Sequence, residues 1–390
     1  CPVSDTFDYL DCCRKKVWKE KQKFIQGEER MNSERVSGRE FRNMMIMFIL
    51  GSSLLAGGAN YTKNDRWLAD IIAIITAVPI LLMYARIAAL NRDKDIYDVF
   101  FDSVGKTFGT VFTILLFNFS IFISCAVLRN LTEFIQVAFF PLTPKYIVAI
   151  MAGLTAYYSI REGIETMARG VSFVVFIIIV ILAGTIILSL EEMDFENFLP
   201  VFTCPVKNMA REAVTLLSFP YLEPIFFLSI TPSLNKKDSP YKTFLTSHFI
   251  SGALLLLLFL RNLLVLGSEL ISNLYYPSYI TISLIDIAEF VTRIEVVVTI
   301  NYIFCIVLKI SICMLSAAKA LRKLTKSDDY KIHLLPVALF TIFYSGVVFE
   351  DTLDMFDSLR YTVYLNLIVQ VLIIIATYIF TEIKHKRKRA

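Results

Sequence analysis

Residues 218–224 have the sequence SFPYLEP and lie near the middle of an apolar run that covers residues 210–230. Pro220 and Pro224 each remove a backbone amide donor and clash with the preceding helical turn, so this run is predicted to form a broken helix. In lipid, an interrupted helix is tolerated only where it is buried in protein or lines a cavity. The break therefore predicts both a membrane protein and a site within it.

Nine further apolar runs occur in this chain of 390 residues, of which 56% are hydrophobic, with a mean hydropathy of +0.61. Several runs are about 20 residues long, which is enough to span a hydrocarbon core of about 30 Å. We therefore predict an all-α polytopic membrane protein with about ten transmembrane helices. The runs cover residues 41–59, 68–90, 111–140, 146–158, 171–190, 210–230, 244–266, 294–318, 332–348 and 361–380.

The basic residues predict the orientation of these spans. From Arg35 onward, the segments on one side of the ten spans hold about 22 Lys and Arg, and those on the other side about 7. Lys and Arg are enriched in cytoplasmic segments of membrane proteins. Because the enriched side includes both chain ends, both termini are predicted to be cytoplasmic.

Three polar segments are predicted to lie outside the membrane. Residues 1–30 are expected to be a disordered or artefactual extension, ahead of a single transmembrane domain of residues 31–390. Residues 268–293, which are rich in tyrosine, are predicted to form an outer segment with an interfacial helix. Residues 383–390 are predicted to be a basic cytoplasmic tail. Since this tail directly follows an apolar helix, we expect it to contact anionic membrane lipid and not nucleic acid.

The first apolar run also contains residues that favour a break. Gly51, Ser52 and Ser53 stand near its middle, followed by Gly57 and Gly58, and such residues lower the free energy of local unwinding. The first and sixth runs each open one half of the chain, where inverted-repeat transporters place discontinuous helices that bind ligands. The alternative is proline kinks and small-residue packing without a ligand. The predicted ligand-binding residues are Gly51, Ser52, Ser53, Phe219, Pro220, Tyr221 and Glu223, with Ser124 and Cys125 of the third run unless these two only bond helices together.

Ionisable side chains inside membrane spans are energetically expensive, so each invites a functional interpretation. Glu223 is predicted to bind a ligand or to carry a coupling proton, with a structural pair to a buried cation as the alternative. Lys309 is predicted to stand where related folds hold a coupling cation or to neutralise Glu223, with snorkelling to the inner face as the alternative. Arg129 is predicted to gate the cavity or to mark a helix end, and Arg261 is expected at the membrane interface.

Signatures of enzymes and metal sites do not appear in the sequence. The seven cysteines form no CxxC pair, and the three histidines are far apart along the chain, unlike the close ligand spacings of zinc sites. No glycine-rich phosphate loop or HExxH motif occurs. We therefore expect a protein that is not an enzyme and has no metal or other cofactor.

Several segments resemble the B subunits of spore germinant receptors. Residues 219–237 begin FPYLEPIFF and end in Asn-Lys-Lys, as the sixth helix of that family does. Residues 276–295 contain a Pro-Ser-Tyr element at 277–279 and the Arg293-x-Glu295 pair, which is the most specific match. Residues 51–55, 65–68 and 264–267 are similar too. The resemblance covers about residues 33–381.

The resemblance implies a fold and a function. That family belongs to the amino acid–polyamine–organocation superfamily, so we expect two inverted five-helix repeats at about residues 41–190 and 206–382. It implies a germinant-sensing subunit of the inner spore membrane, which works with A and C subunits and binds a small polar germinant such as an amino acid between the first and sixth helices. A cation-coupled transporter of amino acids or related metabolites, and a structural subunit with an empty pocket, remain alternatives.

Overall fold

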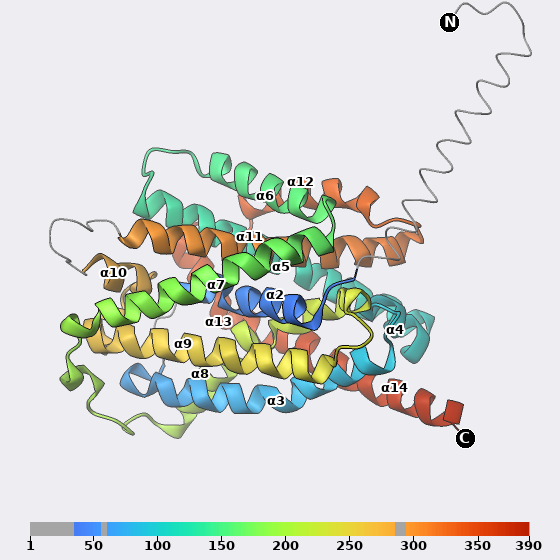
Figure 1. The fold of residues 1–390 in the computed structure, drawn as a ribbon, viewed down its shortest axis with the longest axis horizontal. Coiled ribbons are helices and arrows are strands. Elements are labelled where there is room, and N and C mark those ends of the chain that lie inside the picture. Colours follow the sequence, from blue (N-terminus) through green and yellow to red (C-terminus); the bar gives the residue numbers. More distant parts are fainter. Residues whose placement is uncertain (1–34, 56–60, 285–293, 390) are drawn as a thin grey trace, which may run out of the picture.

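The computed structural model describes residues 35–55, 61–284 and 294–389 (Figure 1). The predictions for residues 1–30, for Gly57 and Gly58, and for the match at 285–293 lie outside these residues. The helices run side by side along the long axis of the molecule (Figure 1). We call the end that holds the C-terminus the terminal end, and the end near α10 (Pro277–Ser283) the α10 end.

Where the structure describes them, all ten predicted apolar runs correspond to helices. In the described part of the chain, six of these helical units are long and apolar enough to cross a membrane. The unit at Lys331–Ser345 is apolar but shorter. The short helices η2 (Lys63–Asp65), α4 (Ile96–Val104), η4 (Phe195–Phe198) and η7 (Thr231–Ser233) join them. The ten helical units are α2 (Gly38–Leu50) with η1 (Gly51–Leu54), α3 (Arg66–Leu90), α5 (Lys106–Ala138), α6 (Lys145–Arg161), α7 (Ile164–Leu188), α8 (Val206–Leu216) with η5 (Leu217–Tyr221) and η6 (Glu223–Ser229), α9 (Pro240–Ile271), α11 (Ile294–Thr325), α12 (Lys331–Ser345), and α13 (Thr352–Leu367) with η8 (Ile368–Leu372) and α14 (Ile373–Arg389).

Two predicted extramembrane segments differ in detail from the structure. The helix α9 continues to Ile271 through Gly267, whose φ of +71° only glycine adopts easily. The helix α10 is not a free interfacial helix, because Ser278, Thr281 and Ile282 are buried and α10 packs against α9 and α11. The residues predicted as a basic tail continue α14 as a helix to Arg389.

The helix α2 lies in the middle of the bundle and packs against α7, α9 and α11 (Figure 1). Nearly every side chain from Phe41 to Leu50 is buried, as expected for a helix that is apolar on all sides. Its first turn is held by a capping box, in which the side chains of Ser37 and Glu40 accept hydrogen bonds from each other's backbone amides.

The start of α2 is tied to the connection between η7 and α9 at the terminal end. Val36 forms an isolated parallel bridge with Leu234, and the Gly38 amide donates to the Asp238 carboxylate at 2.7 Å. The Lys236 ammonium lies 2.7 Å from the Asp93 carboxylate, which adds the α3–α4 connection. These contacts close the terminal end of the bundle around α2.

At the α10 end, the Asp65 carboxylate fixes the start of α3. It is fully buried and accepts hydrogen bonds from the backbone amides of Phe202, Thr203 and Cys204 at 2.7–2.8 Å. The three amides belong to the connection that leads into α8. A single carboxylate therefore joins the start of α3 to the connection that leads into the sixth helical unit.

Replacing this carboxylate should loosen that connection. We expect Asp65→Ala to lower the free energy of unfolding by about 2–4 kcal/mol, because amides that lose a buried partner keep their desolvation penalty. Asp65→Asn should fall between Ala and wild type, since it keeps one carbonyl acceptor. Thermal unfolding of the detergent-solubilised chain measures the order of the three proteins; equal midpoints for Ala and wild type would contradict this role.

Candidate ligand site at the two broken helices

The sixth helical unit is broken at the predicted position. Phe219 leaves helical geometry, with φ −143° and ψ 113°, inside the π-helical turn η5, and the tight helix η6 follows. The freed carbonyls do not point at open space. The carbonyl of Ser218 accepts from the Gln370 side chain at 2.9 Å, and that of Leu222 accepts from the Tyr84 hydroxyl at 3.3 Å. The break is therefore stabilised by polar side chains of η8 and α3.

The first helical unit is interrupted at Gly51. Its φ of +25° and ψ of −127° end α2, and a short 3₁₀ segment follows to Leu54. A β-carbon at this position would lie 2.7 Å from the Cδ atom of Lys309. Glycine is required here for two reasons, since the backbone turns through a region that other residues disfavour and the Lys309 side chain occupies the adjacent space.

A buried ion pair joins the two breaks. The Lys309 ammonium on α11 lies 2.5 Å from Glu223 Oε2, and both side chains are at most 1% exposed. The same ammonium donates to Ser52 Oγ at 3.4 Å and lies 4.4 Å from the centre of the Phe219 ring. The structure thus brings Lys309 and Glu223 together as a buried ion pair, and the Lys309 ammonium does not reach the surface.

A cavity of about 390 Å³ extends from the breaks toward the α10 end. Four predicted residues line it, namely Ser53, Phe219, Pro220 and Tyr221, while Gly51, Ser52 and Glu223 lie behind its wall. The volume is in the range of small-molecule sites, about 300–1,000 Å³. Ser53 Oγ and Glu223 Oε1 are buried without a hydrogen-bond partner in the described part of the chain. The breaks therefore supply both space and unused polar atoms.

Ser124 and Cys125 of α5 do not line this cavity. Ser124 Oγ donates to the carbonyl of Ile121 at 2.9 Å and lies 3.5 Å from Thr341 Oγ1 of α12, and Cys125 Sγ lies 3.6 Å from the Thr341 carbonyl. Both side chains face α12. This placement agrees with the alternative that they bond helices together.

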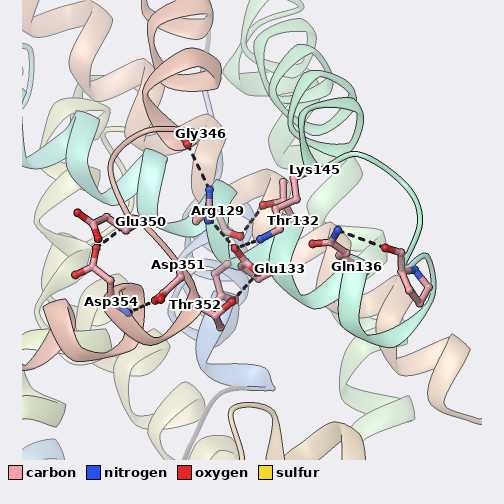
Figure 2. Close-up of polar contacts among 12 residues, drawn as sticks. Arg129, Thr132, Glu133, Gln136, Lys145, Gly346, Glu350, Asp351, Thr352 and Asp354 are labelled. Carbon is pink, nitrogen blue, oxygen red and sulfur yellow. Dashed lines mark hydrogen bonds and ion pairs between the residues drawn. The ribbon is translucent and has the colours of Figure 1, made fainter.

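Arg129 lies in a polar cluster at the α10 end, away from the cavity lining (Figure 2). Its Nε atom is 2.7 Å from Glu133 Oε1, and its guanidinium donates to the Gly346 carbonyl at 3.5 Å. Glu133 also accepts from Lys145 at 2.7 Å and from Thr352 at 2.8 Å (Figure 2). The cluster ties α5 and α6 to the connection between α12 and α13, so any gating role of Arg129 acts through these helices.

Sequence reasoning missed several polar residues that line the cavity together with the breaks. Arg66 and Asp70 of α3, Glu212 of α8, Asn262 of α9 and Asn366 of α13 all line the cavity. A carboxylate such as Asp70 inside a predicted span was a usable signal, because ionisable groups in spans are rare and usually functional.

Arg261 corrects a second expectation. Arg261 is 1% exposed and donates to the side chains of Asn262 and Thr185, so its guanidinium is buried between helices and does not lie on the outer surface of the bundle. The reason is tertiary, because α7 and α9 pack together at this level and cover the guanidinium.

The ion pair should show strong energetic coupling. We expect Glu223→Gln or Lys309→Met alone to destabilise the chain by about 3–5 kcal/mol, since each leaves a buried charge unpaired. The double variant should recover a large part of this loss. Thermal unfolding of the four proteins gives the coupling free energy; additive losses would contradict the pairing. Neutralising the exposed pair Lys63–Glu269 is the control, with an effect below about 1 kcal/mol.

Gly51 should tolerate no side chain. We expect Gly51→Ala to destabilise the chain by about 1–3 kcal/mol, because the new β-carbon displaces Lys309 and the backbone conformation is unfavourable for alanine. The matched control is Gly184→Ala in α7, which has open space at the β-carbon and should be neutral or slightly stabilising. The thermal unfolding midpoints of both variants are measured side by side. A midpoint for Gly51→Ala that is no lower than that for Gly184→Ala would contradict the requirement for glycine at position 51.

Comparison with known proteins places these features in a family. The family model described as "Spore germination protein" matches residues 35–355. The chain is 24% identical over 372 residues to spore germination protein KB of Bacillus subtilis (strain 168), which covers 92% of this chain and 97% of that protein. It is 22% identical over 292 residues to spore germination protein GerQB of Bacillus cereus, with 73% and 78% covered.

Solved transporter structures share the fold. MhsT in complex with L-phenylalanine has a TM-score of 0.70 at 13% identity and covers 87% of this chain and 88% of its own. The nucleobase-cation-symport-1 family transporter MHP1 has a TM-score of 0.62 at 12% identity, with 87% and 78% covered. At such identities the likeness shows the fold alone. It confirms the predicted all-α transporter-like architecture with two inverted five-helix repeats. From the match over residues 35–355, this chain belongs to the spore germination protein family and is an integral membrane protein.

Proposed function

We propose that the chain is the germinant-sensing membrane subunit of a spore germination receptor. A small polar ligand such as an amino acid binds in the cavity at the first and sixth helical units. Binding favours one arrangement of the transporter-like bundle, and the change passes to partner subunits. A ligand shifts such an equilibrium only through its different affinity for the two arrangements.

The observation that carries this proposal is the cavity at the breaks. It is lined by Ser53 and by Phe219, Pro220 and Tyr221, so a bound molecule touches the interrupted parts of both helical units. The unpartnered Ser53 Oγ offers a hydrogen bond, and the Phe219 ring offers apolar contact. A ligand in this position therefore acts on the two elements most easily rearranged.

The ion pair supports sensing over cation-coupled transport. Coupled carriers of inverted-repeat folds bind a mobile cation at unwound helices. Here the Lys309 ammonium contacts Glu223 of the sixth unit and Ser52 of the first, so a fixed positive charge stands at the breaks. A side-chain ammonium holds the two units together but does not dissociate and cross the membrane.

The family membership and the charge distribution support a proposal for the location and the partners of the chain. We propose that it lies in the inner spore membrane with both termini in the cytoplasm and assembles with A and C subunits. The cavity then opens toward the outside of that membrane, because its lining reaches Tyr275 and Phe356 at the α10 end. This orientation suits a receptor that samples molecules arriving from outside the cell.

Cation-coupled transport of amino acids or related metabolites is the alternative function. It is favoured by the shared fold with MhsT, whose structure contains L-phenylalanine. The two functions differ in whether a gradient drives net movement of the ligand. They share the cavity, so cavity variants alone do not separate them.

Spores of the source organism provide the first test. We expect deletion of the gene to abolish dipicolinic acid release in response to one class within a panel of amino acids, nucleosides and sugars. Complementation with wild type should restore release, and Phe219→Ala, which strips the cavity wall, should raise the half-effective germinant concentration at least about tenfold. Glu269→Gln, on the exposed surface, is the control. Normal dose–response curves with Phe219→Ala would exclude the cavity.

Proteoliposomes separate the alternative. We expect no accumulation of the effective germinant against its concentration gradient when a sodium or proton gradient is imposed, because the cation at the breaks is part of the chain. Accumulation that collapses with the gradient would establish coupled transport instead. The same uptake is measured with an equal amount of reconstituted Lys309→Met protein, which lacks the ammonium at the breaks.

A further inference from the structure

Charged side chains line the cavity beside the breaks. Among the described residues that line it are three carboxylates, Asp70, Glu212 and Asp357, and one guanidinium, Arg66. Which of these charges a ligand meets depends on the partners that each group already has.

Two of these groups already compensate each other. Arg66 Nε lies 3.9 Å from Glu212 Oε1, and the guanidinium lies 5.1 Å from the centre of the Phe259 ring. Glu212 also accepts the Tyr61 amide at 3.0 Å. These contacts fix both side chains at the outer part of the cavity.

Asp70 is different, because half of its carboxylate is unused. The residue is 5% exposed, and its Oδ1 atom accepts a hydrogen bond from the Tyr221 hydroxyl at 2.7 Å. No described residue donates to its Oδ2 atom. Arg66, one turn earlier on α3, contributes a nearby positive charge but no hydrogen bond to this carboxylate. A buried carboxylate with a single hydrogen-bond donor keeps acceptor capacity for a ligand, and Asp70 is part of the cavity wall.

We propose that Asp70 binds the protonated primary amine of the ligand. The Tyr221 hydroxyl holds the Asp70 carboxylate in position for this contact. An ammonium group supplies both an N–H donor for the unused oxygen and the compensating charge. A sugar or nucleoside hydroxyl supplies only the donor. The inference rests on the proposed function and makes it specific: the ligand is an amino acid or another alkylamine.

The position of Tyr221 gives this contact a consequence for the breaks. Tyr221 ends η5, and its hydroxyl is the link between the sixth unit and Asp70 of α3. An ammonium at Asp70 therefore lies beside the interrupted helix and strengthens or replaces the hydrogen bond that ties it to α3. The charge of the ligand and the position of the sixth helical unit are therefore coupled through the Tyr221 side chain.

Binding measurements on the purified full-length chain test the inference. The probes are L-alanine, L-leucine and L-phenylalanine, their N-acetyl derivatives, and ethylamine, 3-methylbutylamine and phenethylamine, the same molecules without the carboxylate. Affinities come from thermal shifts and radioligand competition with wild type, Asp70→Asn, Tyr221→Phe and the control Glu269→Gln. Size-exclusion profiles establish that each variant is folded.

We expect wild type and the control to prefer a free amine over its N-acetyl form by at least about 30-fold, since a buried ion pair to the ligand is lost on acetylation. Asp70→Asn should reduce this preference to within about threefold. Tyr221→Phe should weaken binding but keep the preference. Binding of the decarboxylated amines would show that the amine suffices, and binding of the amino acids alone would add a carboxylate requirement; both support the role of Asp70.

Two results would overturn the inference while leaving the proposed function intact. One is an unchanged preference in folded Asp70→Asn protein, while Phe219→Ala, measured in the same way, weakens binding at least about tenfold. The other is equal binding of free and N-acetyl forms by wild type, which decides the matter even if Asp70→Asn does not fold. Failure of every probe to bind, together with an unaltered germination response on gene deletion, would reject the proposed function itself.

Discussion

The ion pair between Lys309 and Glu223 is the interaction on which the centre of this membrane protein depends. A helix can be interrupted in a medium without water only if other groups satisfy the polar atoms that the interruption exposes. Here the sixth unit places a carboxylate at its break, and α11 supplies the ammonium at 2.5 Å. Because the same ammonium reaches Ser52, the pair also holds the first unit against the sixth.

Other side chains complete this arrangement from the surrounding helices. Tyr84 and Gln370 bond the freed carbonyls of the sixth unit, and Gly51 leaves space for the stem of Lys309. The polar atoms at the break are thus shared among α3, α11 and η8. A change at the cavity is felt by several helices at once, which is what a protein that signals from a bound ligand requires.

The two ends of the bundle differ in a way that suits this role. At the terminal end, the start of α2 is strapped to the η7–α9 connection by a backbone bridge and by Asp238. At the α10 end, the cavity reaches the helix connections, and the cluster around Glu133 ties α5 and α6 to α13 (Figure 2). The contacts at the terminal end thus fix the start of α2, whereas the cavity at the breaks extends toward the α10 end.

The sequence by itself determined the fold class, the ten helical units and the two breaks, because hydrocarbon thickness sets helix length and Pro220, Pro224 and Gly51 act on the local backbone. It also marked Glu223 and Lys309, since a charge inside a span is conspicuous. Only the tertiary structure decided which charges meet. Lys309 lies far from Glu223 along the chain, Ser124 and Cys125 face α12, Arg261 is buried, and Asp70 lines the cavity. The physical reason is that the helical period fixes the direction of a side chain only relative to its own helix, whereas the packing of neighbouring helices decides what it faces.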